Sequence, residues 1–110
     1  MFEIPILDAN DSLTEVELDG VTYFLRLSWN SEADQWVLSI ENAYNELIVA
    51  GIAVMPDTPL LGSYRHLALP AGELVARAPD RRDAISRTAL PSGVVPLMYI
   101  EADEAADGQI

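Results

Sequence analysis

Residues 16–30 read VELDGVTYFLRLSWN, and this stretch decides the fold. Apolar and polar side chains alternate on both sides of Asp19-Gly20, which is the pattern of half-buried β-strands. An Asp-Gly pair between two alternating segments is a strong hairpin signal, because both residues of the tight turn must tolerate a positive φ. The stretch therefore predicts a β-hairpin, with one strand from Glu15 to the turn and a second over residues 21–29.

The second strand of this hairpin alternates over nine residues, which favours a central position in a sheet. We expect its odd-numbered side chains to point inward: Val21, Tyr23, Leu25, Leu27 and Trp29. On the first strand, Glu15, Glu17 and Asp19 fall on the side opposite Val16 and Leu18. We interpret these three carboxylates as a solvated outer face rather than a cation site.

A second hairpin follows, with a polar break at residues 30–34 and a strand over residues 35–40 whose inward residues are Trp36, Leu38 and Ile40. Residues 47–55 are then an almost continuous apolar run, interrupted by Gly51. Its length and β-branched content predict a strand buried on both faces, with Gly51 as a bulge or a close contact.

The rest of the chain is less regular. We predict three short strands near its two ends: residues 2–7, 73–77 and 94–100. Residues 8–12 are expected to form a polar turn, and residues 78–91 a long polar loop; the conformation of residues 60–69 stays open. A loop of this length in a small domain is functional or disordered.

Together these elements predict an all-β fold: a single small antiparallel β-barrel or sandwich, built from a hairpin meander of six or seven strands with little helix. The chain has 110 residues, half of them hydrophobic, which suits one domain with one core. We assign the domain to residues 1–102 and expect residues 103–110 to be a flexible acidic tail.

The net charge limits the classes of partner that the protein is expected to bind. Eighteen acidic residues stand against six arginines and no lysine, and the net charge is −12. Tight nucleic-acid binding and attraction to anionic lipid both need the opposite sign, so we expect neither. No run of about 18 apolar residues is present, so we expect no membrane insertion. The start of the chain lacks a signal-peptide pattern, which predicts synthesis in a cytoplasm.

Few side chains suited to catalysis are available. There is no cysteine, His66 is the only imidazole, and no serine lies in a nucleophile motif. The glycines are scattered singly, so no phosphate-binding loop is present. We therefore expect no catalytic residues, no cofactor and no metal site. An enzyme that uses His66 with neighbouring carboxylates is a remote alternative.

Arginines gather in and beside the loop of residues 78–91. Because arginine is enriched in interface hot spots, we take the following residues as protein-contact candidates: Arg77, Arg81, Arg82 and Arg87. A second hypothesis uses the aromatic side chains instead. In it, the protein is a free-standing cytoplasmic β-barrel that binds a small ligand through Trp29 and Trp36, although cross-strand core packing of these two residues is the simpler interpretation.

The order and spacing of several segments also resemble a known family. They are IPI at residues 4–6, LDGVTY at 18–23, LRLSWN at 25–30, WVLSI at 36–40, LIVAGI at 47–52, PLL at 59–61, PAGEL at 70–74 and LMYI at 97–100. Each is ordinary strand or turn chemistry, but their succession over residues 4–102 is similar to the cyanophage-type baseplate plug family of contractile-tailed phages and prophages.

This resemblance implies a structural role without catalysis: a plug-type subunit at the central hub of a tail baseplate. It implies baseplate hub and tail-tube proteins as partners, and an oligomeric state within the assembly. It further implies assembly in the bacterial host cytoplasm and a final location in the virion tail. No catalytic or cofactor-binding residue is carried over from the family.

Overall fold

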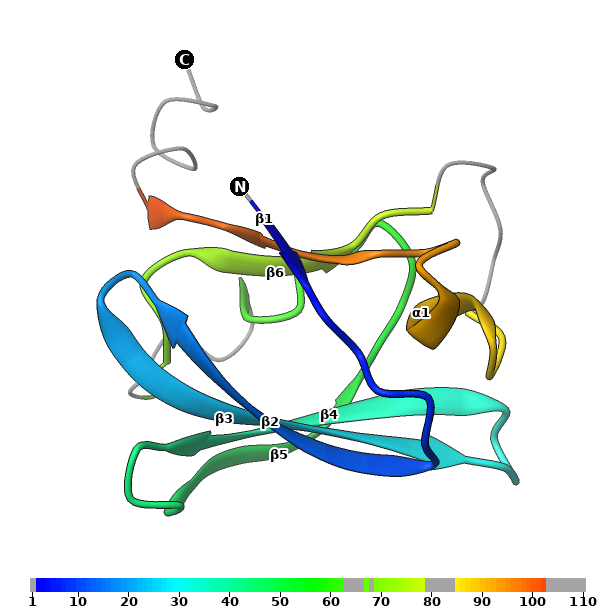
Figure 1. Cartoon of the computed structure of the whole chain (residues 1–110), viewed down its shortest axis with the longest axis horizontal. Helices are drawn as coiled ribbons and strands as arrows, with labels where there is room; N and C mark the ends of the chain where they lie inside the picture. Colours follow the sequence, from blue (N-terminus) through cyan, green and yellow to red (C-terminus); the bar gives the residue numbers. More distant parts are fainter. Residues whose placement is uncertain (1, 63–66, 68, 79–84, 103–110) are drawn as a thin grey trace.

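The computed structural model describes residues 2–62, 67, 69–78 and 85–102, and these form two antiparallel sheets and one short helix (Figure 1). The four-stranded sheet has the order β2 (Asp11–Leu18), β3 (Val21–Asn30), β4 (Gln35–Asn42) and β5 (Leu47–Ala53). The three-stranded sheet has the order β1 (Phe2–Ile4), β7 (Leu97–Ile100) and β6 (Glu73–Ala76). The helix is α1 (Ala89–Ser92). The prediction of an all-β fold with little helix is confirmed.

The hairpin at the Asp-Gly pair is present as predicted. Asp19 and Gly20 have φ values of 52° and 79°, and Leu18 pairs with Val21 across the turn. The strand before the turn, β2, begins at Asp11, four residues earlier than predicted. The added residues carry hydroxyl groups on the inner side, with Ser12 buried, so the hydrophobic pattern did not reveal them.

The second hairpin supplies the centre of the core. Trp36, Leu38 and Ile40 on β4 are fully buried, as predicted. Strand β3 lies inside its sheet, also as predicted, between β2 and β4. Its two outermost inward residues differ from expectation: the side chain of Val21 is 51% exposed and Trp29 is only half-buried. Both lie near the ends of β3, where the core cover is incomplete.

The prediction for the apolar run is wrong in one respect. Strand β5 is an edge strand, and only Val49 and Ile52 on it are buried, while Leu47 is 61% exposed. An apolar run cannot by itself distinguish an edge strand from an interior one, since position in the sheet depends on distant pairing. The bulge predicted at Gly51 is confirmed. Leu38 pairs with Ile52 and Ile40 pairs with Val49. Two residues of β5 therefore lie opposite the single residue of β4 between Leu38 and Ile40.

After β5 the chain crosses from one sheet to the other. The Val54 amide donates a hydrogen bond to the Trp36 carbonyl at 3.0 Å, which continues the pairing of β5 with β4 by one residue. Asp57 N–H then donates to the Ala76 carbonyl at 2.7 Å, and Leu60 N–H to the Leu74 carbonyl at 3.0 Å. The crossing segment therefore covers the outer edge of β6. Within the undecided region, Leu60 and Leu61 are buried.

The two sheets share one core (Figure 1). The three-stranded sheet contributes buried side chains that face the four-stranded one, namely Ile4, Leu74, Ala76, Leu97 and Tyr99. The described strands form two separate sheets and no closed barrel, so the choice between barrel and sandwich stays a prediction.

Several other predicted boundaries also need correction: β4 ends at Asn42 rather than at residue 40, β5 at Ala53 rather than at residue 55, and β6 at Ala76 rather than at residue 77. Strand β1 ends at Ile4 rather than at residue 7, because Pro5 has no N–H to continue the ladder. Strand β7 begins at Leu97 rather than at residue 94, directly after Pro96. The last residues of the predicted loop 78–91 belong to helix α1. The C-cap residue of this helix, Gly93, has a left-handed φ of 84°. A four-residue helix has too few residues to show a helical period. It is the longest helix in the described part of the chain, and none there could cross a membrane.

Replacement of Gly20 by alanine tests the turn. A side chain at a φ of 79° is strained, and we expect the free energy of unfolding to fall by about 1–3 kcal/mol. Gly62→Ala is the matched control, because a Cβ there meets only ordinary contacts at 3.9 Å and the backbone has no positive φ. Urea denaturation of both variants measures the difference, and equal midpoints would contradict the turn geometry.

Candidate functional site

The structure places two of the four arginine candidates. Arg77 follows β6, and Arg87 lies two residues before α1. Arg81 and Arg82 lie outside the described residues, as does His66. The two arginines that can be compared differ in their surroundings, so they do not form one cluster.

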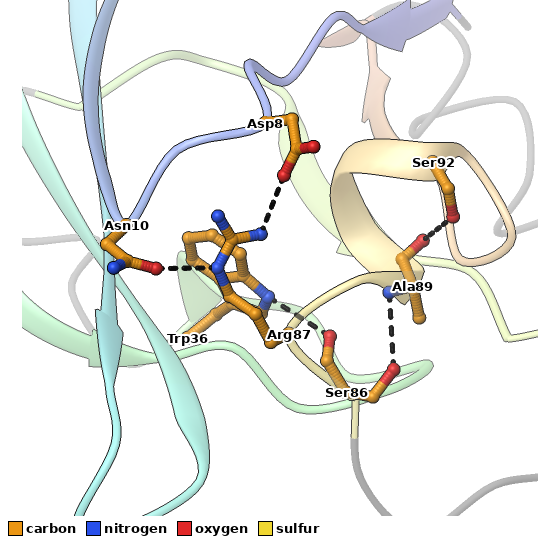
Figure 2. A network of polar contacts seen from close by, with 7 residues as sticks. All are labelled: Asp8, Asn10, Trp36, Ser86, Arg87, Ala89 and Ser92. Atoms are coloured by element: carbon orange, nitrogen blue, oxygen red, sulfur yellow. Dashed lines mark hydrogen bonds and ion pairs between the residues drawn. The ribbon is translucent and has the colours of Figure 1, made fainter.

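Arg87 is engaged within the chain (Figure 2). Its Nε donates a hydrogen bond to Asn10 Oδ1 at 2.7 Å, and its Nη1 forms an ion pair with Asp8 Oδ1 at 3.0 Å. The guanidinium lies over the Trp36 ring, 5.3 Å from the ring centre. Because these contacts occupy both the charge and one face of the group, Arg87 holds the segment before α1 against the β1–β2 connection.

The same segment is tied to β4 by the Trp36 indole. Trp36 Nε1 donates to the Ser86 carbonyl at 3.2 Å. The Ser86 hydroxyl accepts from Ala89 N–H at 3.2 Å, and the Ser92 hydroxyl donates to the Ala89 carbonyl at 3.3 Å (Figure 2). Trp36 and Arg87 thus link residues 85–92 to the four-stranded sheet, and the role of Arg87 in a protein contact stays a prediction.

The aromatic pair behaves mostly as core. Trp29 and Trp36 are directly paired across β3 and β4, with ring centres 5.5 Å apart in an edge-to-face arrangement. Trp36 has no exposed surface, so it cannot contact a ligand. Trp29 is half-buried and lines a hollow of about 360 Å³ with Asp34, Ile85, Ser86 and Arg87. Of this pair, only Trp29 could therefore contact a ligand.

Arg77 differs from the other described arginines. Its backbone N–H donates to the Pro96 carbonyl at 2.9 Å, and its side chain is exposed. Arg26 pairs with Asp11 at 3.0 Å and lies 3.9 Å from Glu41, whereas within the described ranges no carboxylate pairs with Arg77. Of the candidates that the structure places, Arg77 is the one whose charge is available to a partner.

The acidic face of β2 divides into two parts. Glu15 and Glu17 are exposed, as predicted. Asp19, at the turn, points instead to the three-stranded sheet, where its Oδ2 accepts hydrogen bonds from the Tyr99 hydroxyl and from Ala102 N–H. Within the described residues, no group of His, Asp or Glu side chains is arranged to hold a metal ion.

The sequence pattern gave no indication of a special role for Tyr99, although this residue connects the two sheets. Its ring is fully buried, and its hydroxyl accepts a hydrogen bond from Gly72 N–H at 2.8 Å while it donates to Asp19. Burial raises the pKa of Tyr99 far above its ordinary value of 10, and the hydrogen bond to Asp19 raises it further. Burial also raises the pKa of Tyr23, with Asp19 adding to the effect.

The comparison with known families identifies the chain. A family model described as cyanophage baseplate Pam3 plug gp18 matches residues 1–103. The chain belongs to this baseplate plug family. No curated protein matches it. Membership confirms the resemblance seen in the sequence and gives the protein a structural role in the tail baseplate of a phage virion, in association with other baseplate proteins.

The baseplate plug chain depends on Trp36 for the link between its sheet and residues 85–92, so truncation of this residue tests the site. We expect Trp36→Ala to lower the free energy of unfolding by about 3–5 kcal/mol, and Trp29→Ala to cost less because the Trp29 side chain is already partly exposed to water. Chemical denaturation of both variants checks the order. Equal losses would mean that burial does not set the contribution of each ring.

The raised pKa of Tyr99 predicts a loss of stability at alkaline pH. The unfolded chain releases the tyrosine proton near pH 10, before the folded one does, so stability falls as the pH rises above about 10. Tyr99→Phe should reduce this slope, and at neutral pH it should cost about 1–3 kcal/mol because Gly72 N–H loses its acceptor. Tyr44→Phe, at a side chain that is 83% exposed, is the control and should leave the slope of urea midpoint against pH unchanged.

Proposed function

We propose that this chain is the plug-type subunit at the central hub of a contractile tail baseplate, from a phage or a prophage. Its partners are then the baseplate hub and tail-tube proteins, and it is oligomeric within the assembly. The observation that carries the proposal is the family match over residues 1–103, which covers both sheets and the segment that connects them. Assembly takes place in the host cytoplasm before the particle is released.

We also propose that the protein has no catalytic activity. The family description names a part of a particle rather than a reaction. Several polar side chains that the structure describes serve the fold: the buried Tyr99 joins the sheets, and the exposed Asp8 and Asn10 hold Arg87. Because these polar side chains bond to other parts of the fold, they support a structural role for the protein.

The charge distribution bears on DNA that passes through a tail. Residues 1–64 hold eleven carboxylates and one arginine, Arg26, which is itself paired with Asp11. A surface of this sign repels phosphate groups, so we propose that the protein binds no nucleic acid tightly and offers little electrostatic resistance to a moving duplex.

For docking to the other tail proteins, we propose the arginine-bearing loop of residues 78–91. Both of its ends are anchored: Ala78 N–H donates to Asp57 Oδ1 at 3.1 Å, and Arg87 is held by Asp8. Anchored ends support the contact role, because substitutions between them need not disturb either sheet. Arg81 and Arg82 are the two residues we expect to carry the contact.

The test is co-assembly of the protein with the hub and tube proteins encoded beside it, followed by native mass spectrometry. The variant Arg81→Gln with Arg82→Gln should keep its free energy of unfolding within about 0.5 kcal/mol of wild type and lose most of the complex. The control, Ser31→Glu with Ala33→Glu, adds the same two units of negative charge at the exposed β3–β4 turn. If wild type forms no complex, the proposed position fails; if the arginine variant assembles as well as the control, only the loop assignment fails.

A further inference from the structure

The two most exposed large hydrophobic side chains in the described part of the chain lie at the β4–β5 turn. Tyr44, within the turn, is 83% exposed, and Leu47, the first residue of β5, is 61% exposed. Isolated exposed apolar side chains are common, but two large ones three residues apart form a patch that a partner can cover. Figure 1 shows this turn at the opposite end of the long axis from helix α1.

The turn that carries Tyr44 is held by Asn42. The Asn42 Oδ1 accepts hydrogen bonds from the N–H groups of Tyr44 at 2.9 Å and Glu46 at 3.0 Å, and its Nδ2 donates to Glu46 Oε1 at 3.1 Å. The Asn42 carbonyl accepts from Asn45 N–H at 3.0 Å, and the Asn42 N–H donates to the Glu46 carbonyl at 2.9 Å. The backbone around Tyr44 is therefore fixed before any partner binds, which lowers the entropy cost of binding.

The base of this turn is connected to three strands of the sheet. Asn45 Nδ2 donates to Glu41 Oε1 at 3.3 Å, and Glu41 Oε2, on β4, lies 3.9 Å from Arg26 Nε on β3. Arg26 in turn forms an ion pair with Asp11 on β2 at 3.0 Å. The turn therefore stands on a rigid support, and Tyr44 is presented at a defined place relative to the sheet.

The β3–β4 turn shows that a turn of this kind does not need an aromatic residue. It is organised in the same way: Asn30 Oδ1 accepts from Glu32 N–H at 3.1 Å and from Ala33 N–H at 3.2 Å, and Asp34 has a left-handed φ of 50°. Its exposed residues are small or charged. Glu32 occupies the place that Tyr44 has in the other turn, two residues after the asparagine. Turn formation therefore does not account for a tyrosine at position 44.

We propose that Tyr44 is an anchor residue that inserts into an apolar pocket on another tail protein, with Leu47 packed at the edge of that pocket. Tyrosine suits this role because it supplies a large contact area, loses little rotational freedom and adds a hydroxyl group for a hydrogen bond. The rim of the pocket is positively charged, since the exposed Glu46 forms no ion pair within the described part of the chain. This names a contact residue within the proposed function and rests on that function for the identity of the partner.

The charges favour a different protein over a second copy as the partner at this turn. Each copy carries a net charge of −12, and Glu46 adds a carboxylate beside Tyr44. Repulsion weakens a contact between two such copies, whereas a pocket surrounded by arginine or lysine attracts the turn. Because helix α1 lies at the other end of the molecule, this contact is also separate from the one proposed for the loop of residues 78–91, whose last residues belong to α1 (Figure 1).

The test measures binding of the full chain to the hub and tube proteins encoded beside it, each purified separately, by isothermal titration calorimetry. Tyr44→Ala should weaken binding to one of them by roughly tenfold or more. Tyr44→Phe should weaken it less, because the ring stays and only the hydroxyl is lost. Glu46→Gln keeps the oxygen that accepts from Asn42 but removes the charge, so binding should lose part of its salt dependence. Glu32→Ala, the matched change in the β3–β4 turn, should bind like wild type.

Photo-crosslinking gives a second measurement that does not depend on affinity. Tyr44→benzoylphenylalanine should couple to the same protein whose binding Tyr44→Ala weakens, and Glu32→benzoylphenylalanine should not. All of these variants should keep the urea midpoint of wild type, because both side chains are exposed.

The outcomes separate this contact from the proposed function. If wild type binds neither protein, the proposed function fails, and the Tyr44 contact fails with it. If wild type binds and Tyr44→Ala binds equally well, only the Tyr44 contact is wrong. Cross-links from position 44 to a second copy of this chain, in place of a hub or tube protein, would also overturn the contact while leaving the proposed function intact.

Discussion

The hydroxyl of Tyr99 connects the two halves of this structure. It is shared between Gly72 N–H, beside β6, and the Asp19 carboxylate in the β2–β3 turn. A buried hydroxyl must be hydrogen-bonded, so its two partners determine how the four-stranded sheet sits over the three-stranded one. Gly72 has no room for a side chain, since a Cβ would lie 2.0 Å from the Ile100 carbonyl oxygen. With no cysteine in the chain, this polar link and the packing around it take the place of a covalent cross-link.

The strand edges indicate how the protein meets its neighbours. Strand β1 is three residues long and followed by Pro5, β5 is irregular at Gly51, and the outer edge of β6 is covered by the crossing segment. On β2 the exposed residues are Asp11, Leu13, Glu15 and Glu17, three of which are carboxylates. Short length, bulges, cover and charge are the devices that prevent strand addition by another chain. Contacts in the baseplate are therefore expected to be made by side chains on sheet faces and loops rather than by shared ladders.

The features that could be predicted from the sequence are those set by near neighbours. The Asp19-Gly20 turn, the alternation of β3 and β4 and the bulge at Gly51 follow from local rules of backbone conformation and burial. The edge position of β5 could not be predicted, because it depends on which strands pair elsewhere. For the same reason, Tyr99 looked like one more apolar residue of a strand, since its partner Asp19 is 80 residues away in the chain.

For the candidate site, the sequence predicted a group of arginines but not their positions in the fold. Clustered arginines in an acidic chain indicated contacts, but composition could not separate Arg87 from Arg77. Arg87 is 79 residues from Asp8, its ion-pair partner, and it meets Asp8 only because Trp36 and the β1–β2 connection bring that region together.

Solubility and assembly place opposite demands on the surface of this protein. A free subunit must stay dissolved, and a net charge of −12 achieves this by repulsion between copies. An assembled subunit must be packed closely against neighbours, which the same repulsion opposes. On the outer side of the three-stranded sheet, Val75 and Met98 lie near Arg77, but exposed Glu3 pairs with Met98 on the same side and Asp57 lies beside Arg77. A neighbour that packs against this side must therefore bring apolar side chains together with polar groups that satisfy charges of both signs.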